Sequence, residues 1–182
     1  ANGPTTITLT ATDSALTATS VFVLTVNAVN NAPTISAVNA QSTNEDTASG
    51  AIAFTINDID STLSCATSVT GVSSAHGVVL DNAIVFGGTA PNCTATITPV
   101  ANANGPTTVT LTVTDGSLTA QSIFVLTVTA INDAPTISAI TAQSTNEDTA
   151  SSAIAFTIND IDSTLSCATS VTGVSSAHGV VL

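Results

Sequence analysis

Acidic side chains gather in short clusters of this 182-residue sequence. Eight of its 12 Asp and Glu residues belong to two motifs that each occur twice. The first motif is Asn44-Glu45-Asp46, repeated with Glu147 and Asp148, and the second is Asp58-Ile59-Asp60, repeated with Asp160 and Asp162. Carboxylate oxygens are ligands that Ca²⁺ prefers. Two interpretations remain open: calcium sites, or a solvated acidic rim.

The charge balance of the chain limits the classes of partner that it can bind. The chain contains no Lys or Arg and has a formal net charge of −12. Without cationic side chains it cannot clamp phosphates, which argues against nucleic acid as a partner. Attraction to an anionic membrane surface is excluded for the same reason. No apolar run approaches the roughly 18 residues of a membrane span, so we expect no membrane insertion.

The composition indicates an all-β extracellular protein. Hydrophobic residues make up 43% of the chain and charged residues only 7%, which is not a disordered composition. Thr and Val dominate where a helical protein would carry Leu, Glu, Lys and Arg.

The sequence repeats itself with a period of 102 residues. Comparison of residues 1–80 with 103–182 gives 68 identical positions out of 80, and residues 51–80 match at every position. We therefore expect three parts: the C-terminal strands of one repeat in residues 1–31, a complete repeat in 32–133, and the N-terminal part of the next in 134–182. Pro33 and Pro135 follow these boundaries and favour short, stiff junctions with domains stacked end to end.

Strict alternation of apolar and polar residues predicts the strands. Val109, Leu111 and Val113 share one face, and Phe124 and Leu126 continue the pattern after an Asp-Gly-Ser turn, which predicts a hairpin. About seven such strands in roughly 100 residues predict an immunoglobulin-like Greek-key β-sandwich.

This fold would bring the acidic clusters together at the junctions. The first strand runs away from the linker and the second returns, so the Asn44–Asp46 turn lies at one end of a domain and Asp58 and Asp60 at the other. The junction after the complete repeat then combines side chains from both domains: Glu45, Asp46, Asn132, Asp133, Asp160 and Asp162. The junction before it combines Asn30, Asn31, Asp58 and Asp60, with Asp115 as a further candidate. Repulsion between these groups favours a bound cation.

Two cysteines of the complete repeat fall on inward-facing positions of different strands. Cys65 and Cys93 lack the spacing of a metal site, and the composition is extracellular, so a disulfide is expected. Two buried thiols are the alternative.

Several motifs together resemble cadherin-like domains. The strand end Thr112-Val113-Thr114-Asp115-Gly116 and the linker Ile131-Asn132-Asp133-Ala134-Pro135 are similar to the end of such a domain. Asn57-Asp58-Ile59-Asp60 resembles the family's Asp-x-Asp calcium motif, and Glu45 lies where the family keeps a calcium-binding Glu. The chain is most similar to the tandem repeats of very large bacterial surface proteins and adhesins. This resemblance implies Ca²⁺ at the junctions and a bacterial cell surface.

The expected function is structural. Near-identical copies, stiff junctions and the lack of an assembled catalytic motif favour a non-enzymatic spacer in a surface filament or stalk. Its expected partners are other copies of itself. The alternative is an adhesive module that recognises glycan or protein on another cell, but the chain contains no Trp or Tyr to line such a site.

Overall fold

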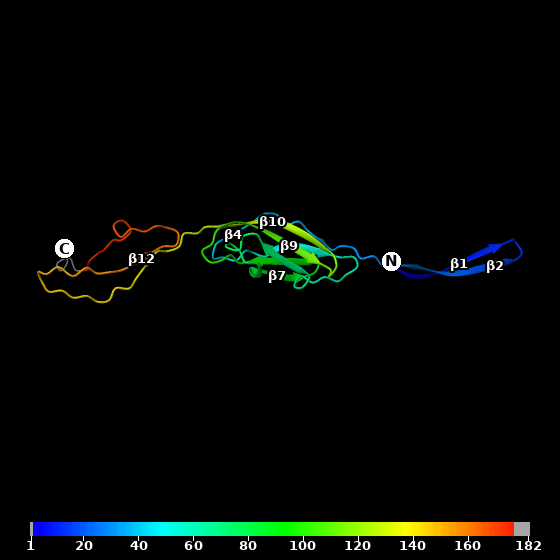
Figure 1. Cartoon of the computed structure of the whole chain (residues 1–182), viewed down its shortest axis with the longest axis horizontal. Coiled ribbons are helices and arrows are strands. Elements are labelled where there is room, and N and C mark those ends of the chain that lie inside the picture. Colours follow the sequence, from blue (N-terminus) through cyan, green and yellow to red (C-terminus); the bar gives the residue numbers. More distant parts are fainter. Residues whose placement is uncertain (1, 177–182) are drawn as a thin grey trace.

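The computed structural model describes residues 2–176. Ala1 and residues 177–182 lie outside the described residues, and with them the last residues of the expected third part. The described chain is elongated, with a hairpin, a sandwich and a partly strand-paired segment in a row (Figure 1). The structure is an all-β sandwich, which is the fold class that the alternation of apolar and polar residues predicts.

The sandwich consists of two four-stranded sheets. One sheet has the order β4-β10-β9-β6, from β4 (Gln41–Asn44), β10 (Thr119–Thr129), β9 (Gly105–Thr114) and β6 (Val69–Ser73). The other has the order β3-β5-β8-β7, from β3 (Thr34–Ile35), β5 (Ile52–Asn57), β8 (Asn92–Ile97) and β7 (Ile84–Thr89). The crossovers between sheets make this an immunoglobulin-like arrangement, as predicted.

The first strand of the sandwich is divided between the two sheets. Its first half, β3, pairs antiparallel with β5, and its second half, β4, pairs parallel with β10. The hydroxyl of Ser122 on β10 accepts a 3.1 Å hydrogen bond from the backbone N–H of Val38 at the crossing point. The split explains how eight strand segments form a seven-stranded fold.

Alternating side chains of both sheets fill the core. On β9, Val109, Leu111 and Val113 are fully buried, while the intervening Thr side chains face outward. On β5, Ile52, Phe54 and Ile56 alternate in the same way. Phe54 meets Phe86 of β7 edge to face, with ring centroids 6.3 Å apart. This geometry suits the quadrupoles of the two rings.

A short 3₁₀ turn, η1 (Asp81–Ala83), precedes β7. The strand β7 begins directly after it, at Ile84, and extends to Thr89. Gly88 allows the tight turn from β7 to β8, because its φ is +91° and a Cβ there would lie 2.5 Å from the carbonyl oxygen of Asn92.

The hairpin of β1 (Gly3–Thr12) and β2 (Thr17–Val26) is a second copy of β9–β10. Ile7 pairs with Phe22, just as Val109 pairs with Phe124. At the other end of the chain, β11 (Thr136–Ile137) pairs with β12 (Ile158–Asn159) in the register that β3 and β5 have in the sandwich.

Candidate cation sites at the repeat junctions

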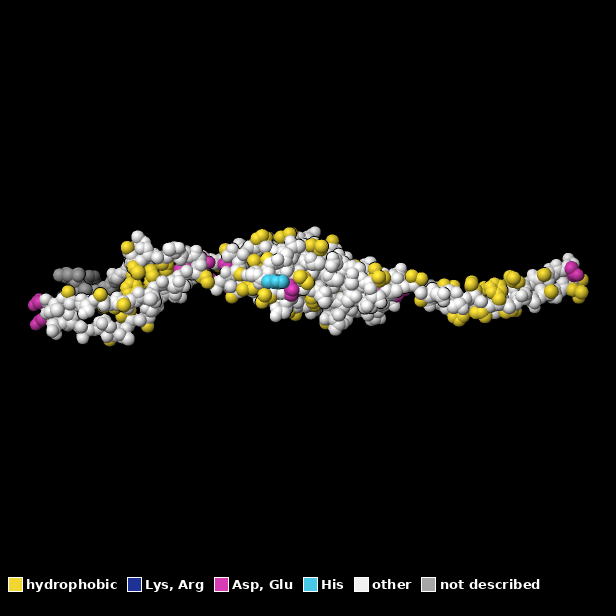
Figure 2. Space-filling model, viewed as in Figure 1, with side chains coloured by type: hydrophobic (Ala, Val, Ile, Leu, Met, Phe, Trp, Pro, Cys, Tyr) yellow, Lys and Arg dark blue, Asp and Glu magenta, His cyan; other side chains and the backbone are white. Residues whose placement is uncertain are grey.

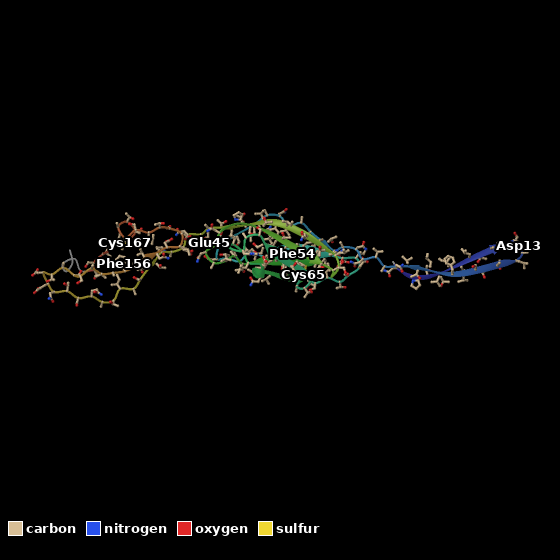
Figure 3. The ribbon with its side chains drawn as sticks, viewed as in Figure 1. Asp13, Glu45, Phe54, Cys65, Phe156 and Cys167 are labelled. Atoms are coloured by element: carbon tan, nitrogen blue, oxygen red, sulfur yellow. A yellow bond between two sulfur atoms is a disulfide. The ribbon has the colours of Figure 1, made fainter. Side chains whose placement is uncertain are left out.

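The strand register positions the acidic clusters at opposite ends of the sandwich. Thr34 lies opposite Asn57, so the linker that precedes β3 meets the turn that follows β5. At the other end, Asn44 pairs with Thr129, so Glu45 lies beside the linker that follows β10. In Figure 3, the labelled Glu45 lies at the narrow neck between the sandwich and the last part of the chain.

We call the set Asn30, Asn31, Asp58, Asp60 and Asp115 the first junction. Oδ1 of Asp58 accepts hydrogen bonds from the backbone N–H groups of Asp60 (2.7 Å) and Ser61 (2.8 Å), which fixes the turn. Oδ2 of Asp60 accepts two hydrogen bonds from Asn31, one from the backbone nitrogen at 2.8 Å and one from Nδ2 at 2.7 Å. The Asp60 carboxylate thus holds the linker against the sandwich.

The β9–β10 turn also contacts this linker. Nδ2 of Asn30 donates a 2.8 Å hydrogen bond to Oδ2 of Asp115. Oδ1 of Asp115 accepts from the backbone N–H groups of Leu118 and Ser117, and these bonds, together with the one from Asn30, lower the pKa of Asp115 below its usual range. Asp115 is therefore held in its charged form at the first junction.

The second junction comprises Glu45, Asp46, Asn132, Asp133, Asp160 and Asp162. Its Asp-x-Asp turn repeats the first, because Oδ1 of Asp160 accepts from the backbone nitrogens of Asp162 (2.9 Å) and Ser163 (2.8 Å). The backbone N–H of Asp133 donates a 2.6 Å hydrogen bond to Oδ2 of Asp162. Nδ2 of Asn132 donates to the carbonyl oxygen of Asp133 at 3.0 Å.

Glu45 joins the sandwich to the second linker. Its side chain is only 2% exposed, and Oε1 accepts a 2.6 Å hydrogen bond from the backbone N–H of Ile131. The next residue, Asp46, has a φ of +55° and accepts a 2.9 Å hydrogen bond from the backbone N–H of Asn102. These contacts depend on main-chain donors, which leave no signal in the side-chain pattern of a sequence.

The carboxylates of the second junction repel one another. The pKa of Asp133 is raised above its usual value, first by loss of solvent and then by the negative charges of Asp162, Asp46, Glu45 and Asp160. The ionised form of Asp133 is therefore disfavoured where it lies. Figure 2 shows magenta acidic side chains at this neck, with no cationic side chain anywhere on the visible face.

Among residues 2–176, three carboxylate oxygens at the junctions are buried and have no hydrogen-bond partner. They are Oδ2 of Asp58 at the first junction, and Oε2 of Glu45 and Oδ2 of Asp133 at the second. A buried charged oxygen without a partner is costly, and a cation would satisfy it. These oxygens fit the hard-cation chemistry of Ca²⁺.

The described side chains do not assemble a complete carboxylate cage. Within residues 2–176, no group of three or more His, Cys, Asp or Glu side chains is gathered closely enough to hold a metal ion. The eleven junction residues therefore stay a predicted ligand set, and Asn amide or backbone oxygens would have to complete the coordination.

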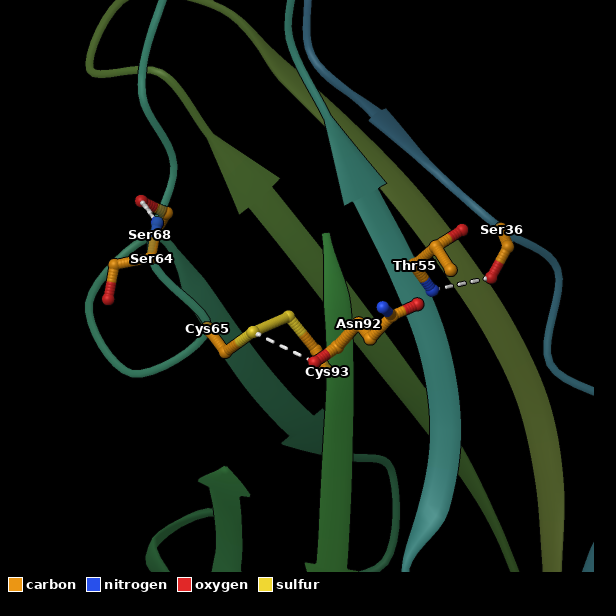
Figure 4. Close-up of a disulfide and its surroundings, with 7 residues drawn as sticks. All are labelled: Ser36, Thr55, Ser64, Cys65, Ser68, Asn92 and Cys93. Carbon is orange, nitrogen blue, oxygen red and sulfur yellow. Dashed lines mark hydrogen bonds between the residues drawn. A yellow bond between two sulfur atoms is a disulfide. The ribbon is translucent and has the colours of Figure 1, made fainter. Parts of the chain in front are cut away.

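The cysteines of the sandwich form the expected disulfide. Cys65 and Cys93 are bonded, with Cα atoms 5.4 Å apart, inside the range typical of disulfides (Figure 4). Cys93 lies on β8 and Cys65 in the segment before β6, and both are almost completely buried. The link closes a sequence separation of 28 residues across the core.

One further contact, which the spacing of charged residues did not predict, orders the loop around η1. Oδ1 of Asp81 accepts a 2.8 Å hydrogen bond from the backbone N–H of Ser73 and lies 3.1 Å from Nε2 of His76. The bond from Ser73, and secondarily the contact with His76, lowers the pKa of Asp81. The pair is visible as cyan beside magenta in Figure 2. It holds a surface loop and lies on the side of the sandwich.

Comparisons with known proteins place the sandwich in a family. The model of the cadherin-like domain matches residues 29–129, which is more than half of the chain. No curated protein sequence matches the chain. In residues 2–176, helices of the length and apolar character needed to cross a bilayer do not occur.

Two solved structures are among those that align with the chain. The titin domains Z1Z2 in complex with telethonin align with 71% of this chain and 62% of theirs, at 14% identity and a TM-score of 0.47. Domains 4–9 of the surface layer protein SbsC align with 86% of this chain and 24% of theirs, at 15% identity and a TM-score of 0.35. The family match and the disulfide together indicate an extracellular module of a non-catalytic domain type. The chain belongs to the cadherin-like domain family.

Proposed function

We propose that the chain is a structural repeat of a bacterial surface filament or stalk, stiffened by Ca²⁺ at its junctions. The cadherin-like sandwich supplies a stable, disulfide-linked rod segment, and the linkers supply the hinges between segments. The function of such a repeat is to hold distance and direction, which requires no catalytic group. Its partners in the filament are further copies of the same repeat.

The observation that carries the proposal is the pair of unsatisfied oxygens at the second junction. Oε2 of Glu45 belongs to the sandwich and Oδ2 of Asp133 to the linker, and both are buried without a partner. The Asp-x-Asp turn of the next repeat is attached to the same linker through Asp162 and Asp133. A cation bound there would have ligands from both sides of the hinge.

Ca²⁺ would supply positive charge and oxygen coordination at these places. Glu45, Asp46, Asn132, Asp133, Asp160 and Asp162 would hold it at the second junction, and Asn30, Asn31, Asp58 and Asp60, with Asp115, at the first. Since the chain has no Lys or Arg, a solution cation is the available means of neutralising these carboxylates. Without it, repulsion between the carboxylates opposes the hydrogen bonds that hold the linkers and widens the range of hinge angles.

Small-angle X-ray scattering with and without chelator tests the proposal. In calcium, we expect a larger maximum dimension and a rod-like profile, whereas chelator should produce a shorter, bent ensemble. The double substitution Asp160→Asn with Asp162→Asn should remove the calcium response at the second junction, and Asp13→Asn, in the distant β1–β2 turn, is the matched control. Identical profiles in calcium and in chelator, together with no calcium binding by calorimetry, would reject the proposal.

A further inference from the structure

Strand β7 forms an open edge of the complete sandwich. Among residues 2–176, its only neighbour within the sheet β3-β5-β8-β7 is β8, and in Figure 1 it lies at the lower margin of the sandwich, away from β10. The backbone N–H of Thr98 donates a 3.1 Å hydrogen bond to the carbonyl oxygen of Ala83, which fixes the alternation along this antiparallel ladder. Every second residue of β7 therefore turns its main-chain groups away from the sheet: Ile84, Phe86 and Gly88.

The neighbouring edge strand, β6, is protected in a way that β7 is not. The backbone N–H of Ser74 bonds to the carbonyl oxygen of Thr108 on β9, so the N–H of Ser73 points away from that sheet. Oδ1 of Asp81 accepts this N–H at 2.8 Å, which places a carboxylate on the edge of β6. Charged side chains on an edge strand prevent a further strand from pairing with it. Asp81 therefore closes the edge of β6.

The sequence of β7 contains none of the residues that usually protect an edge. The strand reads Ile-Val-Phe-Gly-Gly-Thr over residues 84–89, without a charged residue or a proline, and it begins with three residues of high β-propensity. Val85 is 61% exposed on the outer face of the sheet. An uncharged edge of this kind is a template for another strand.

The pattern of large and small residues in β7 fits a second copy of the same strand. In an antiparallel pair with a two-fold axis at Phe86, Val85 of one copy lies opposite Gly87 of the other, so the branched side chain meets no opposing side chain. The same register keeps Gly88 at the end of the pairing, where its φ of +91° does not interrupt the ladder. Residues 84–88 of each copy would then pair with residues 84–88 of the other.

The distribution of charge also favours this partner. Two chains that each carry a formal net charge of −12 repel one another unless their carboxylates stay apart. The carboxylate nearest to β7 in the sequence is Asp81, five residues before the axis. Its two copies would lie roughly 30 Å apart, at about 3.3 Å per residue, which exceeds the screening length of about 8 Å at physiological ionic strength. The uncharged edge can therefore pair without bringing these like charges together.

We propose that β7 is an edge-to-edge docking site for a second copy of this chain, in an antiparallel pair about a two-fold axis at Phe86. The two sheets β3-β5-β8-β7 become one continuous sheet, joined by main-chain hydrogen bonds of Phe86 and its neighbours. The contact uses the same patch on both copies, so it closes as a dimer. The inference rests on the proposed function only in taking further copies as the partner, and it needs no calcium, because no residue of β7 is a carboxylate.

Sedimentation velocity of the whole chain tests the inference in chelator and about 0.15 M salt, over a concentration series up to about 1 mM. We expect a monomer–dimer equilibrium, and Val85→Asp, which brings like charges to the pairing edge, should shift it at least about 10-fold to higher concentration. Val125→Asp is the matched control, because Val125 also faces outward from a strand and is 43% exposed, but lies in the other sheet.

A wild-type chain that stays monomeric throughout, or equal effects of the two substitutions, would overturn the inference. The scattering response to calcium is measured on dilute chain and does not involve β7. A missing dimer would therefore leave the proposed stiffening by calcium intact, and a missing calcium response would leave the dimer intact.

Disulfide trapping tests the register separately. In a Cys167→Ser background, Val85→Cys chains mixed with Gly87→Cys chains should form more intermolecular disulfide than either variant alone, because the two positions lie opposite each other. A side chain at position 87 comes within 3.2 Å of Oγ1 of Thr94, so the Thr94 side chain must shift slightly. Val125→Cys chains mixed with Gly87→Cys chains are the control and should not be trapped. Equal trapping in the two mixtures, or none in either, would contradict the docking, and preferential trapping of Gly87→Cys with itself would contradict the register.

Discussion

The backbone N–H of Asp133 donates a 2.6 Å hydrogen bond to Oδ2 of Asp162, which fastens the second linker to the turn of the following repeat. The first junction has the same bond, between Asn31 and Asp60, at 2.8 Å. The two junctions differ in the linker side chain. Nδ2 of Asn31 adds a second bond to Asp60, whereas Asp133 brings another carboxylate and leaves its Oδ2 unpartnered.

This difference predicts that the second junction binds calcium more tightly through Asp133. Asp133→Asn removes a negative charge and a carboxylate ligand, so its calcium affinity should fall about 10-fold, or about 1.4 kcal/mol. The reciprocal substitution Asn31→Asp should strengthen binding at the first junction. Isothermal titration calorimetry measures both, and an unchanged affinity in Asp133→Asn would show that this carboxylate is not a ligand.

Asp133 at the second junction and Asp81 in the loop around η1 should make the stability of the chain depend on pH in opposite directions. The pKa of Asp133 is raised above its ordinary value of 3.8. In the absence of calcium, the destabilising charge of this side chain is therefore absent well below pH 3.8 and fully present above the raised pKa. Asp81 has a lowered pKa, so its contribution to stability is present above 3.8 and is lost as the pH falls through the lowered value.

Urea unfolding in chelator, compared between variants, measures these contributions. In Asp81→Asn, the free energy of unfolding should fall less steeply than in the wild type as the pH is lowered. In Asp133→Asn, the stabilisation that the wild type gains from protonation of Asp133 at low pH should be absent. Far-ultraviolet circular dichroism is the suitable probe, since the chain has no Trp or Tyr. Parallel pH profiles for wild type and Asp81→Asn would contradict the assigned role of the bond from Ser73.

The disulfide should contribute about 3.5 kcal/mol to the stability of the sandwich, from the loop that it closes in the unfolded chain. The double substitution Cys65→Ala with Cys93→Ala removes it, and reduction of the wild type should have a similar effect. Thermal unfolding followed by circular dichroism checks this expectation. Cys167→Ala is the control, because Cys167 is an exposed free thiol and its loss should leave the melting temperature unchanged.

The repeat offers a matched test of core packing. Leu111→Ala should destabilise the sandwich by about 2–5 kcal/mol, because the side chain is fully buried. Leu9→Ala alters the equivalent position of the hairpin, where the side chain is 58% exposed, and should leave the unfolding of the sandwich unchanged in dilute, monomeric chain. A similar loss from both substitutions would mean that the hairpin packs on the sandwich.

Local pattern was sufficient to predict the strands and the disulfide. Val109, Leu111 and Val113 alternate with Thr so strictly that only one face of β9 can be buried. Cys93 lies on the inward face of a similar alternation on β8. Pattern did not predict the divided first strand, because that depends on where β10 passes and on the contact between Ser122 and Val38. Pattern also does not indicate where β7 ends, since its Gly87-Gly88 portion has no apolar alternation.

The candidate sites could be located from the sequence only in outline. The order of strands was enough to predict which end of the sandwich each acidic cluster occupies. It could not indicate that Glu45 is buried and accepts from the main chain at Ile131, or that Asp46 accepts from Asn102. Such bonds arise from the path of the backbone, and backbone donors are the same at every residue.

Calcium is proposed to restrict the second junction to one arrangement, and one distance measurement tests this directly. Cys167 provides a natural exposed thiol beyond the junction, and Thr112→Cys provides a second one on the outward face of β9. Spin labels at these two positions, studied by pulsed electron paramagnetic resonance in dilute solution, report the distribution of distances across the hinge. We expect a broad distribution in chelator that narrows to a single peak in calcium, and that stays broad in calcium when Glu45→Gln and Asp133→Asn are introduced. A distribution of equal width with and without calcium would contradict it.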